Sequence, residues 1–247
     1  MPHHPFRVLC CALLALATGC TTVTPSVDRV AAQPLTADRL KAAAVTGADL
    51  GPGYTVTVMA PGRETRQGSD RRTSDVAACQ PVLDAVGPGD PATGPFAETD
   101  LDVAVAADPR TDPKGARGSV YTGLLAFKPG RAADIQTELD QVLARCGSFT
   151  STGQSAGGPG RKGGVVRARH RLARLDTPTP EGADGATAFT LTDESGPDPL
   201  AQRALMARTG TVLAVFTTVG TGKDPAPAPD DRLVRTQVAK LHRAQQP

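Results

Sequence analysis

Aromatic side chains are scarce in this chain of 247 residues, which has no tryptophan, two tyrosines and six phenylalanines. Proteins that bind sugars or single-stranded bases commonly stack them on exposed aromatic rings, so the scarcity argues against both classes. The charge balance is also even, with 27 basic and 25 acidic residues, and no run of basic residues forms a stripe. We therefore expect no nucleic-acid partner.

Metal-ligand patterns are missing as well. The histidines and cysteines nowhere have the spacing of a metal site. Aspartates such as Asp108 and Asp112 lie close together, but no stretch has the complete ligand pattern of a calcium loop, so these are interpreted as surface carboxylates. We expect no metal and no cofactor.

The N-terminal apolar run is too short to cross a bilayer as a stable helix, and it follows the basic residue Arg7. It ends in the small residues Ala17-Thr18-Gly19 before Cys20, which resembles a bacterial lipobox. In such proteins the signal is cut before the cysteine, whose thiol takes a diacylglyceryl group, and the new amino terminus often gains an acyl chain such as palmitate. An ordinary secretory signal with an accidental cysteine is the alternative.

This resemblance predicts a lipoprotein signal peptide over residues 1–19 and lipidation at Cys20. The protein would lie on the extracytoplasmic face of the cell membrane, held there by its lipid anchor. Residues 20–35 are rich in threonine, valine, proline and alanine without periodicity, which predicts a tether. Residues 36–247 have no internal repeat and no break between self-sufficient halves, so we expect a single domain.

Two cysteines remain outside the signal and the anchor, because Cys10 and Cys11 leave with the signal peptide. Cys79 and Cys146 form an even pair in an oxidising compartment, which predicts one disulfide. Two buried free thiols are the alternative.

Periodic apolar patterns predict the secondary structure. Strands are expected at residues 54–59, 101–105, 118–128, 165–175, 186–192, 200–208 and 211–219. Helices are expected from Thr36 to near Gly47, from Pro81 to 86, from 130 to 146, and after a cap at Asp230 or Asp231. Residues 48–53, 61–74 and 148–164 are predicted turns or loops. Because strands outnumber helices and come in adjacent runs, we expect an α+β fold, a mainly antiparallel sheet with flanking helices.

Several short motifs resemble those of a known family. They are Thr46-Gly47-Ala48-Asp49-Leu50-Gly51-Pro52-Gly53-Tyr54, Cys79-Gln80-Pro81, the helix ending in Cys146, the hairpin Arg208-Thr209-Gly210-Thr211-Val212-Leu213 and the closing helix. Together they resemble actinobacterial sensor-domain lipoproteins, whose fold is similar to the extracellular PknH-like sensor domain of receptor Ser/Thr kinases. The resemblance implies a cleft for an extracellular ligand.

The chain departs from that family in two respects. The kinase sensor domain carries two disulfides, whereas this chain offers cysteines for one. The kinase motifs themselves are missing, including the His-Arg-Asp loop and the Asp-Phe-Gly motif. A sensor of this kind would have to pass its signal to a partner or deliver a bound molecule.

Candidate cleft residues are Tyr54, Tyr121, Arg169 and His170. The histidine lies within an arginine-rich strand, and a ligand-facing histidine beside Arg169 and Arg171 would suit an anionic ligand. The two tyrosines are the only ones in the chain and would line the cleft. The alternative for His170 is a plain sheet residue, and for the tyrosines it is packing in the core or at its rim.

One motif suggests catalysis. Gly153-Gln154-Ser155-Ala156-Gly157 matches the Gly-x-Ser-x-Gly pattern of a hydrolase nucleophile elbow. That elbow needs a strand-to-helix turn, and here the match lies in a Gly/Ser-rich stretch where a helix is not expected. We therefore expect no enzyme. The sequence favours a lipoprotein that binds a small ligand or an envelope partner, with a structural accessory protein of the envelope or a Ser155 hydrolase as alternatives.

Overall fold

The computed structural model describes residues 34–59, 72–87, 94–106, 118–155 and 163–246. The predicted signal peptide, Cys20 and most of the predicted tether lie outside these ranges. Residues 31–247 form one compact unit. In the described ranges, no helix is both long enough and apolar enough to cross a bilayer.

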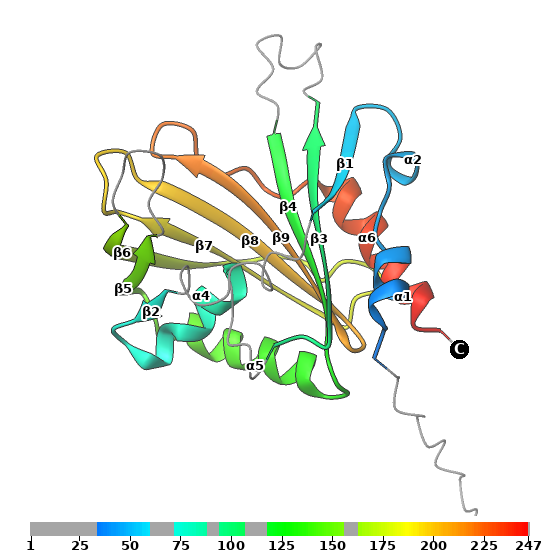
Figure 1. Ribbon diagram of the computed structural model, residues 1–247, viewed down its shortest axis with the longest axis horizontal. Helices are drawn as coiled ribbons and strands as arrows, with labels where there is room; N and C mark the ends of the chain where they lie inside the picture. The colour runs from blue at the N-terminus through cyan, green and yellow to red at the C-terminus, as the bar shows by residue number, and fades with distance from the viewer. Residues whose placement is uncertain (1–33, 60–71, 88–93, 107–117, 156–162, 247) are drawn as a thin grey trace, which may run out of the picture. The chain divides into compact units, whose positions relative to one another are not determined.

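A nine-stranded antiparallel sheet forms the centre of this unit (Figure 1). Its strands are β1 (Tyr54–Met59), β2 (Thr73–Ser74), β3 (Ala97–Val105), β4 (Gly118–Ala126), β5 (Ser148–Ser155), β6 (Gly164–Leu175), β7 (Gly185–Asp193), β8 (Leu200–Thr209) and β9 (Val212–Thr221). They lie in the order β1-β3-β4-β9-β8-β7-β6-β5-β2. The last strand, β9, therefore joins the early strands to the later ones at the middle of the sheet.

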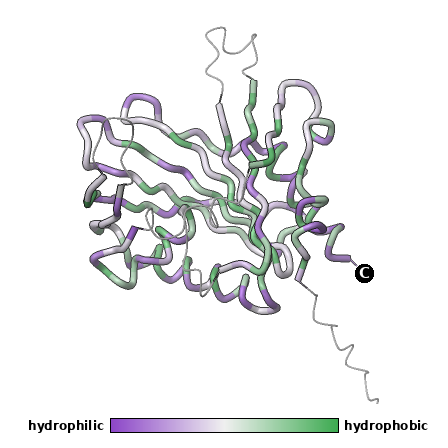
Figure 2. Tube along the Cα trace, in the orientation of Figure 1, coloured by the Kyte–Doolittle hydropathy of each residue, from purple (hydrophilic) through white to green (hydrophobic). Residues whose placement is uncertain are grey.

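Alternation along the strands produces two hydrophobic cores, one on each face of the sheet. In β8, Leu205 and Ala207 belong to the first core, whereas Ala204 and Met206 belong to the second. This follows from the two-residue period of a strand, and Figure 2 shows hydrophobic stretches in the strands at the centre of the sheet. A sheet that is apolar on both faces needs cover on both sides.

Helices from different parts of the chain supply that cover (Figure 1). The first core includes residues of α1 (Ala37–Ala42), α2 (Gly47–Leu50) and α6 (Asp231–Ala244). The second core includes residues of the 3-10 helix η1 (Ala77–Cys79), α4 (Gln80–Val86) and α5 (Arg131–Leu143). The α+β fold, the antiparallel sheet with flanking helices and the single domain are thus confirmed.

The disulfide between Cys79 and Cys146 is confirmed too, with 5.8 Å between the two Cα atoms. Cys79 directly precedes α4, and Cys146 lies just after α5. Both cysteines are buried in the second core. The bond therefore ties together the two helices that cover this face.

The first helical segment differs from its prediction. The helix that begins after the predicted cap Thr36 ends at Ala42, and a second short helix occupies Gly47–Leu50, where a turn was expected. The reason is a capping box: the Thr46 backbone N–H donates to Asp49 Oδ2 at 2.7 Å, and the Asp49 N–H donates to Thr46 Oγ1 at 3.4 Å. Gly47 therefore begins a helix, whereas the prediction had it ending one.

Two predicted loops also contain strands. Ser148–Ser155 forms β5, and Thr73–Ser74 forms β2. β5 is a strand although its sequence is rich in serine, threonine and glycine, because it pairs with β6 along its length and with β2 at Ser151 and Thr152. Phe149 and Ser151 of β5 are buried on the second face. Tertiary pairing therefore overrides a weak local preference.

Both ends of the domain are anchored in the first core. Leu35, which the sequence placed at the end of the tether, is buried beside the helices of this core. At the other end Asp230 is the N-cap of α6, and its carboxylate accepts from the Leu233 N–H at 2.8 Å. The choice between Asp230 and Asp231 as the cap is settled in favour of Asp230.

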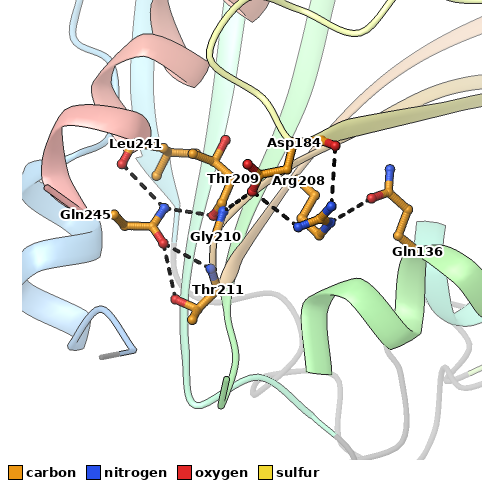
Figure 3. A network of polar contacts seen from close by, with 8 residues as sticks. All are labelled: Gln136, Asp184, Arg208, Thr209, Gly210, Thr211, Leu241 and Gln245. Carbon is orange, nitrogen blue, oxygen red and sulfur yellow. Dashed lines mark hydrogen bonds and ion pairs between the residues drawn. The ribbon is translucent and has the colours of Figure 1, made fainter. Parts of the chain in front are cut away.

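The tight turn between β8 and β9 is held by polar contacts from two directions (Figure 3). Gly210 adopts a left-handed φ of 53°, and its N–H donates to Asp184 Oδ2 at 2.6 Å. The side chain of Gln245, at the end of α6, donates to the Thr209 carbonyl at 2.7 Å and accepts from the Thr211 N–H at 2.9 Å.

Arg208 connects this turn to the opposite layer. Its guanidinium donates to Gln136 Oε1 of α5 at 2.9 Å and forms an ion pair with Asp184 at 3.2 Å (Figure 3). The motif Arg208-Thr209-Gly210-Thr211 thus links α5, α6 and the central hairpin. In this structure its role is to hold the fold together.

Candidate functional site

A pocket of about 480 Å³ opens on the second face of the sheet, beside α4. Six aliphatic side chains contribute to its lining, and we call them the aliphatic wall: Leu83, Val86, Val166, Leu191, Leu200 and Val219. Arg72, His170 and Asp193 also line it, and we call these three the polar corner. Gln154 and Gln202 are further polar residues of the lining.

Part of the aliphatic wall is exposed to solvent. Val219 is 59% exposed, Leu200 is 51% exposed, and Val166 is also among the exposed large hydrophobic residues. These three residues lie on β9, β8 and β6. Side chains two residues apart on a strand point to the same face, so each of the three shares its face of the sheet with the alternate residues of its strand. Scattered exposed valines need no explanation, but several gathered in one pocket indicate a binding surface.

His170 is the most deeply buried member of the polar corner, with 2% of its surface exposed. It lies on β6, opposite Phe149 of β5, and the two ring centroids are 5.0 Å apart. Its Nε2 lies 2.7 Å from Oγ of Ser151, a residue that is itself buried. Phe149 and Ser151 together hold the imidazole in one orientation.

The other ring nitrogen of His170 has no such partner. Among the described residues, nothing forms a hydrogen bond with the buried Nδ1. If Ser151 donates to Nε2, then Nδ1 carries the proton and is a donor; in the other tautomer Nδ1 is an acceptor. In both cases a buried polar atom lacks a partner, which is costly unless a ligand or water supplies one.

The remaining members of the polar corner form an ion pair. Arg72 Nη1 lies 3.6 Å from Asp193 Oδ2. Asp193 is the register partner of His170 across β6 and β7, and its Oδ1 accepts from the Ser195 N–H at 3.0 Å. Asp193 is thus held by contacts on both oxygens.

Burial lowers the pKa of His170 from its ordinary value, and the positive charge of Arg72 lowers it further, against the opposing effect of Asp193. For Asp193, burial alone would raise the pKa, but hydrogen bonds from Ser195 and the nearby His170 and Arg72 lower it on balance. At neutral pH the corner therefore holds a neutral imidazole, one cation and one anion, and its net charge is zero.

A serine and a histidine in contact form the pair that serine hydrolases use. Ser151, however, is only 1% exposed and is not part of the pocket lining, so its hydroxyl is not placed to attack a ligand there. A carboxylate that orients the ring is also missing, since no described residue bonds Nδ1. The contact is better suited to positioning the imidazole than to activating a nucleophile.

Ser155, the serine of the Gly-x-Ser-x-Gly match, is the last residue of β5 and pairs with Gly164 of β6. The first three residues of the motif therefore lie along a strand. Ala156 and Gly157 lie outside the described residues, so the turn that an elbow requires is not among them.

The four predicted cleft residues do not line one pocket. His170 lines the pocket described above. Its neighbour Arg169 is exposed and forms an ion pair with Glu194 at 3.4 Å. Because adjacent strand residues point to opposite faces, Arg169 cannot share the pocket with His170.

The two tyrosines lie towards the other end of the sheet. Tyr54 on β1 packs against the first core, and its hydroxyl donates to Asp230 Oδ1 at 3.0 Å. The guanidinium carbon of Arg232 lies 5.9 Å from the Tyr54 ring centroid. Tyr121 lies half-buried on β4 as the register partner of Thr217, and neither tyrosine belongs to the pocket lining.

Sequence reasoning missed Arg72, Asp193 and the aliphatic wall. These residues come from four strands, from α4 and, for Arg72, from the position just before β2, and only the tertiary structure brings them together. One signal was present in β7, where Asp193 follows Phe189 and Leu191 at two-residue spacing. An acidic residue on an apolar strand face is unusual enough to mark a site.

In the part of the chain that the structure describes, no group of three or more His, Cys, Asp or Glu side chains could hold a metal ion. The polar corner and the aliphatic wall are suited to hydrogen bonding and apolar contact. The pocket can therefore bind and orient a molecule.

Comparisons with known proteins add little. No protein-family model matches the chain, and no curated protein is similar to it. Among solved structures, the chain is similar to an uncharacterized protein from Mycobacterium smegmatis, described as an Rv0999 ortholog. The identity is 13%, the TM-score is 0.39, and the alignment covers 83% of this chain and 95% of that chain. A similarity at this level supports no conclusion about fold or function.

Proposed function

We propose that this protein is a lipid-anchored extracytoplasmic lipoprotein whose single domain binds a ligand in the His170 pocket and does not transform it. The observation that carries this proposal is the pocket of about 480 Å³, in which partly exposed aliphatic side chains lie beside the polar corner of Arg72, His170 and Asp193. Aliphatic side chains gathered around a few polar groups are typical of a binding pocket. A sensor-like role agrees with the resemblance to sensor-domain lipoproteins of the PknH-like kind.

The anchoring part of the proposal rests on the sequence around Cys20. The residues before Cys20 have the basic start, apolar stretch and small residues of a lipoprotein signal. Residues 21–34 of the tether would reach at most about 50 Å when extended, which keeps the domain near the membrane. More than one acyl chain would make that anchoring stable.

The anchor is tested by metabolic labelling with radioactive palmitate in a bacterial host that processes lipoproteins. The wild-type chain should carry label and partition into the detergent phase, and Cys20→Ser should do neither. A wild-type chain that is exported but unlabelled would overturn the lipid anchor and favour the ordinary secretory signal.

Ligand binding is tested by thermal unfolding of residues 31–247 across a panel of envelope lipids, peptides, saccharides and small metabolites. A ligand present at about 100 times its dissociation constant should add about 2.7 kcal/mol to the free energy of unfolding. The same ligand should stabilise His170→Gln less. A panel without any stabilising molecule would overturn the proposal and favour the structural accessory protein.

A further inference from the structure

One side of β6 carries a row of arginines. Arg167, Arg169 and Arg171 are spaced two residues apart, so they share one face of the sheet, opposite to the face that bears the pocket. All three residues are exposed, and the side chains of Arg169 and Arg171 are 70% and 71% exposed. Val165 is 63% exposed and lies at the start of the same row. We call these four side chains the arginine face.

The helices that cover the first core do not extend over the arginine face. Leu175, at the end of β6, packs against that core, but no other described residue of β6 and none of β5 does. These two strands lie towards the end of the sheet that is remote from β1, whereas α1, α2 and α6 lie near β1 (Figure 1). On β5 the register partners of the arginines include Thr150 and Thr152, whose side chains are short. The arginine face is therefore open to solvent.

The arginine face keeps a net positive charge. Glu194, just after β7, forms an ion pair with Arg169 at 3.4 Å and another with Arg171, so one carboxylate compensates two guanidinium groups. Arg167 forms no ion pair with any residue that the structure describes. Three cations and one anion leave a net charge of +2. Because arginine stays protonated at every ordinary pH, this charge is permanent.

The arrangement of the arginines suits an extended anionic surface. A single small anion is bound best by donors that converge on it, whereas alternate residues of a strand are about 6.8 Å apart along it. β6 has no tyrosine, phenylalanine or tryptophan on which bases could stack, which disfavours a nucleic acid. Cations that attract anionic lipid headgroups, with an apolar side chain beside them, are the features by which peripheral proteins bind a membrane surface.

The proposed lipid anchor would bring such a surface within reach. Nine strands at about 4.8 Å spacing make a sheet roughly 40 Å wide, whereas the tether would extend to about 50 Å. The domain can therefore turn any of its faces towards the membrane to which the chain is anchored.

We propose that the arginine face docks onto the anionic lipid surface of that membrane. The guanidinium groups contact headgroup phosphates, and Val165 lies at the boundary between headgroups and acyl chains. Because the pocket is on the opposite face of the sheet, this docking leaves the pocket turned away from the lipid. The inference rests on the lipid anchor of the proposed function for its location, but the docking itself needs only the arginine face.

Sedimentation with vesicles tests the docking without the anchor. The protein is residues 20–247 with Cys20→Ser, and the probes are vesicles of phosphatidylcholine alone or with about one-third phosphatidylglycerol. The anionic vesicles should be bound at least about tenfold more tightly than the neutral ones. Raising the salt concentration from about 0.05 M to about 0.5 M should remove most of this binding, because salt screens exposed charges.

A triple variant assigns the binding to the arginine face. R167Q/R169Q/R171Q should weaken binding to anionic vesicles at least about tenfold. The matched control is R145Q/R235Q/R243Q, which removes the same charge from exposed positions of α6 and the end of α5. Its affinity should equal that of the chain with all six arginines. Thermal unfolding confirms that both triple variants are folded.

Two single variants test the remaining parts of the surface. Glu194→Gln removes the only acidic partner of the row and should tighten binding to anionic vesicles severalfold. Val165→Glu places an anion at a position that is 63% exposed, so the fold should tolerate it, and it should weaken binding severalfold. Val58→Glu on β1 is its control, since Val58 is 50% exposed and lies at the other end of the sheet.

Several results would overturn the inference. Equal binding to neutral and anionic vesicles would exclude docking by charge, and an equal loss in the two triple variants would exclude the arginine face. Binding of heparin or polyglutamate without any binding of vesicles would mean that the partner is an acidic polymer. If the wild-type chain takes up palmitate but the unanchored chain ignores anionic vesicles, the anchor stands and this inference fails. An unlabelled chain that binds them would overturn the anchor and support the arginine face.

Discussion

The imidazole Nε2 of His170 lies 2.7 Å from the hydroxyl oxygen of Ser151, and both side chains are buried. The two residues are diagonal neighbours, since Ser151 is the register partner of Ala168 and His170 that of Phe149. The hydrogen bond occupies one ring nitrogen, and the other is buried without a partner among the described residues. Ser151 is therefore a positioning residue for His170.

Replacing Ser151 tests this relationship. Ser151→Ala should lower the free energy of unfolding by about 1–3 kcal/mol, because it leaves a second nitrogen of a buried imidazole without a partner. Ser148→Ala in the same strand is the control, since Ser148 is exposed. Urea denaturation of both variants provides the measurement. Equal stability of the two would show that the hydrogen bond contributes nothing to the fold.

Acid should destabilise the domain through His170. Burial lowers the pKa of His170 in the folded state, so the unfolded chain takes up the proton first as the pH falls. The stability contributed by the neutral ring is complete above about pH 6.5, the ordinary pKa of histidine, and is lost progressively below it. Asp193 opposes this loss, and Arg72 adds to it.

The pH effect can be assigned by substitution. In His170→Gln, the fall in the free energy of unfolding just below pH 6.5 should be smaller than in the unaltered chain. His242→Gln is the matched control, because His242 is exposed near the end of α6, and it should retain the full fall. A His170→Gln variant with an unchanged pH dependence would contradict the assignment.

The disulfide should contribute strongly to stability. Cys79 and Cys146 are 67 residues apart, and closing a loop of this length in the unfolded chain is worth about 4 kcal/mol in the chain-entropy model. The double variant Cys79→Ala, Cys146→Ala should lose about that amount in a denaturant titration. The unreduced protein should also show no free thiol at these positions by alkylation and mass spectrometry, and alkylation of both without a reductant would contradict the bond.

Gly210 should not tolerate a side chain. Its φ of 53° is left-handed, and a Cβ there would lie 2.2 Å from Oε1 of Gln245, which holds the turn between β8 and β9. Gly210→Ala should therefore cost about 1–3 kcal/mol of the free energy of unfolding. Gly147→Ala is the control, since a Cβ there meets nothing within 4 Å. Thermal unfolding of both compares the two sites, and the idea fails if their melting temperatures agree.

Elements with a strong local pattern were predictable. The α5 helix shows apolar residues at helical spacing, and β6 alternates arginines with Ala168, His170 and Leu172. The disulfide was predictable by elimination once the signal and the anchor accounted for the other cysteines. In these cases the prediction depends on a periodic pattern within one segment, or on the number of cysteines that remain after the signal and the anchor.

Elements that depend on distant partners were not predictable. β5 is rich in serine, threonine and glycine, and it is a strand because it pairs with β6 along its length and with β2 at Ser151 and Thr152. The short helix at Gly47–Leu50 differs, because its capping box joins Thr46 and Asp49, only three residues apart, and this local signal was missed. Only the further contact of Asp49 with Lys240 of α6, at 2.7 Å, depends on a distant residue.

The candidate site divides in the same way. The sequence by itself determined that His170 shares a strand face with apolar residues, since alternation is a local property of the chain. Only the tertiary structure decided what surrounds it, because Arg72, Asp193 and Val219 reach the pocket from segments far apart in the sequence. Antiparallel pairing sets that arrangement, and pairing depends on the packing of both faces of the sheet rather than on any one segment.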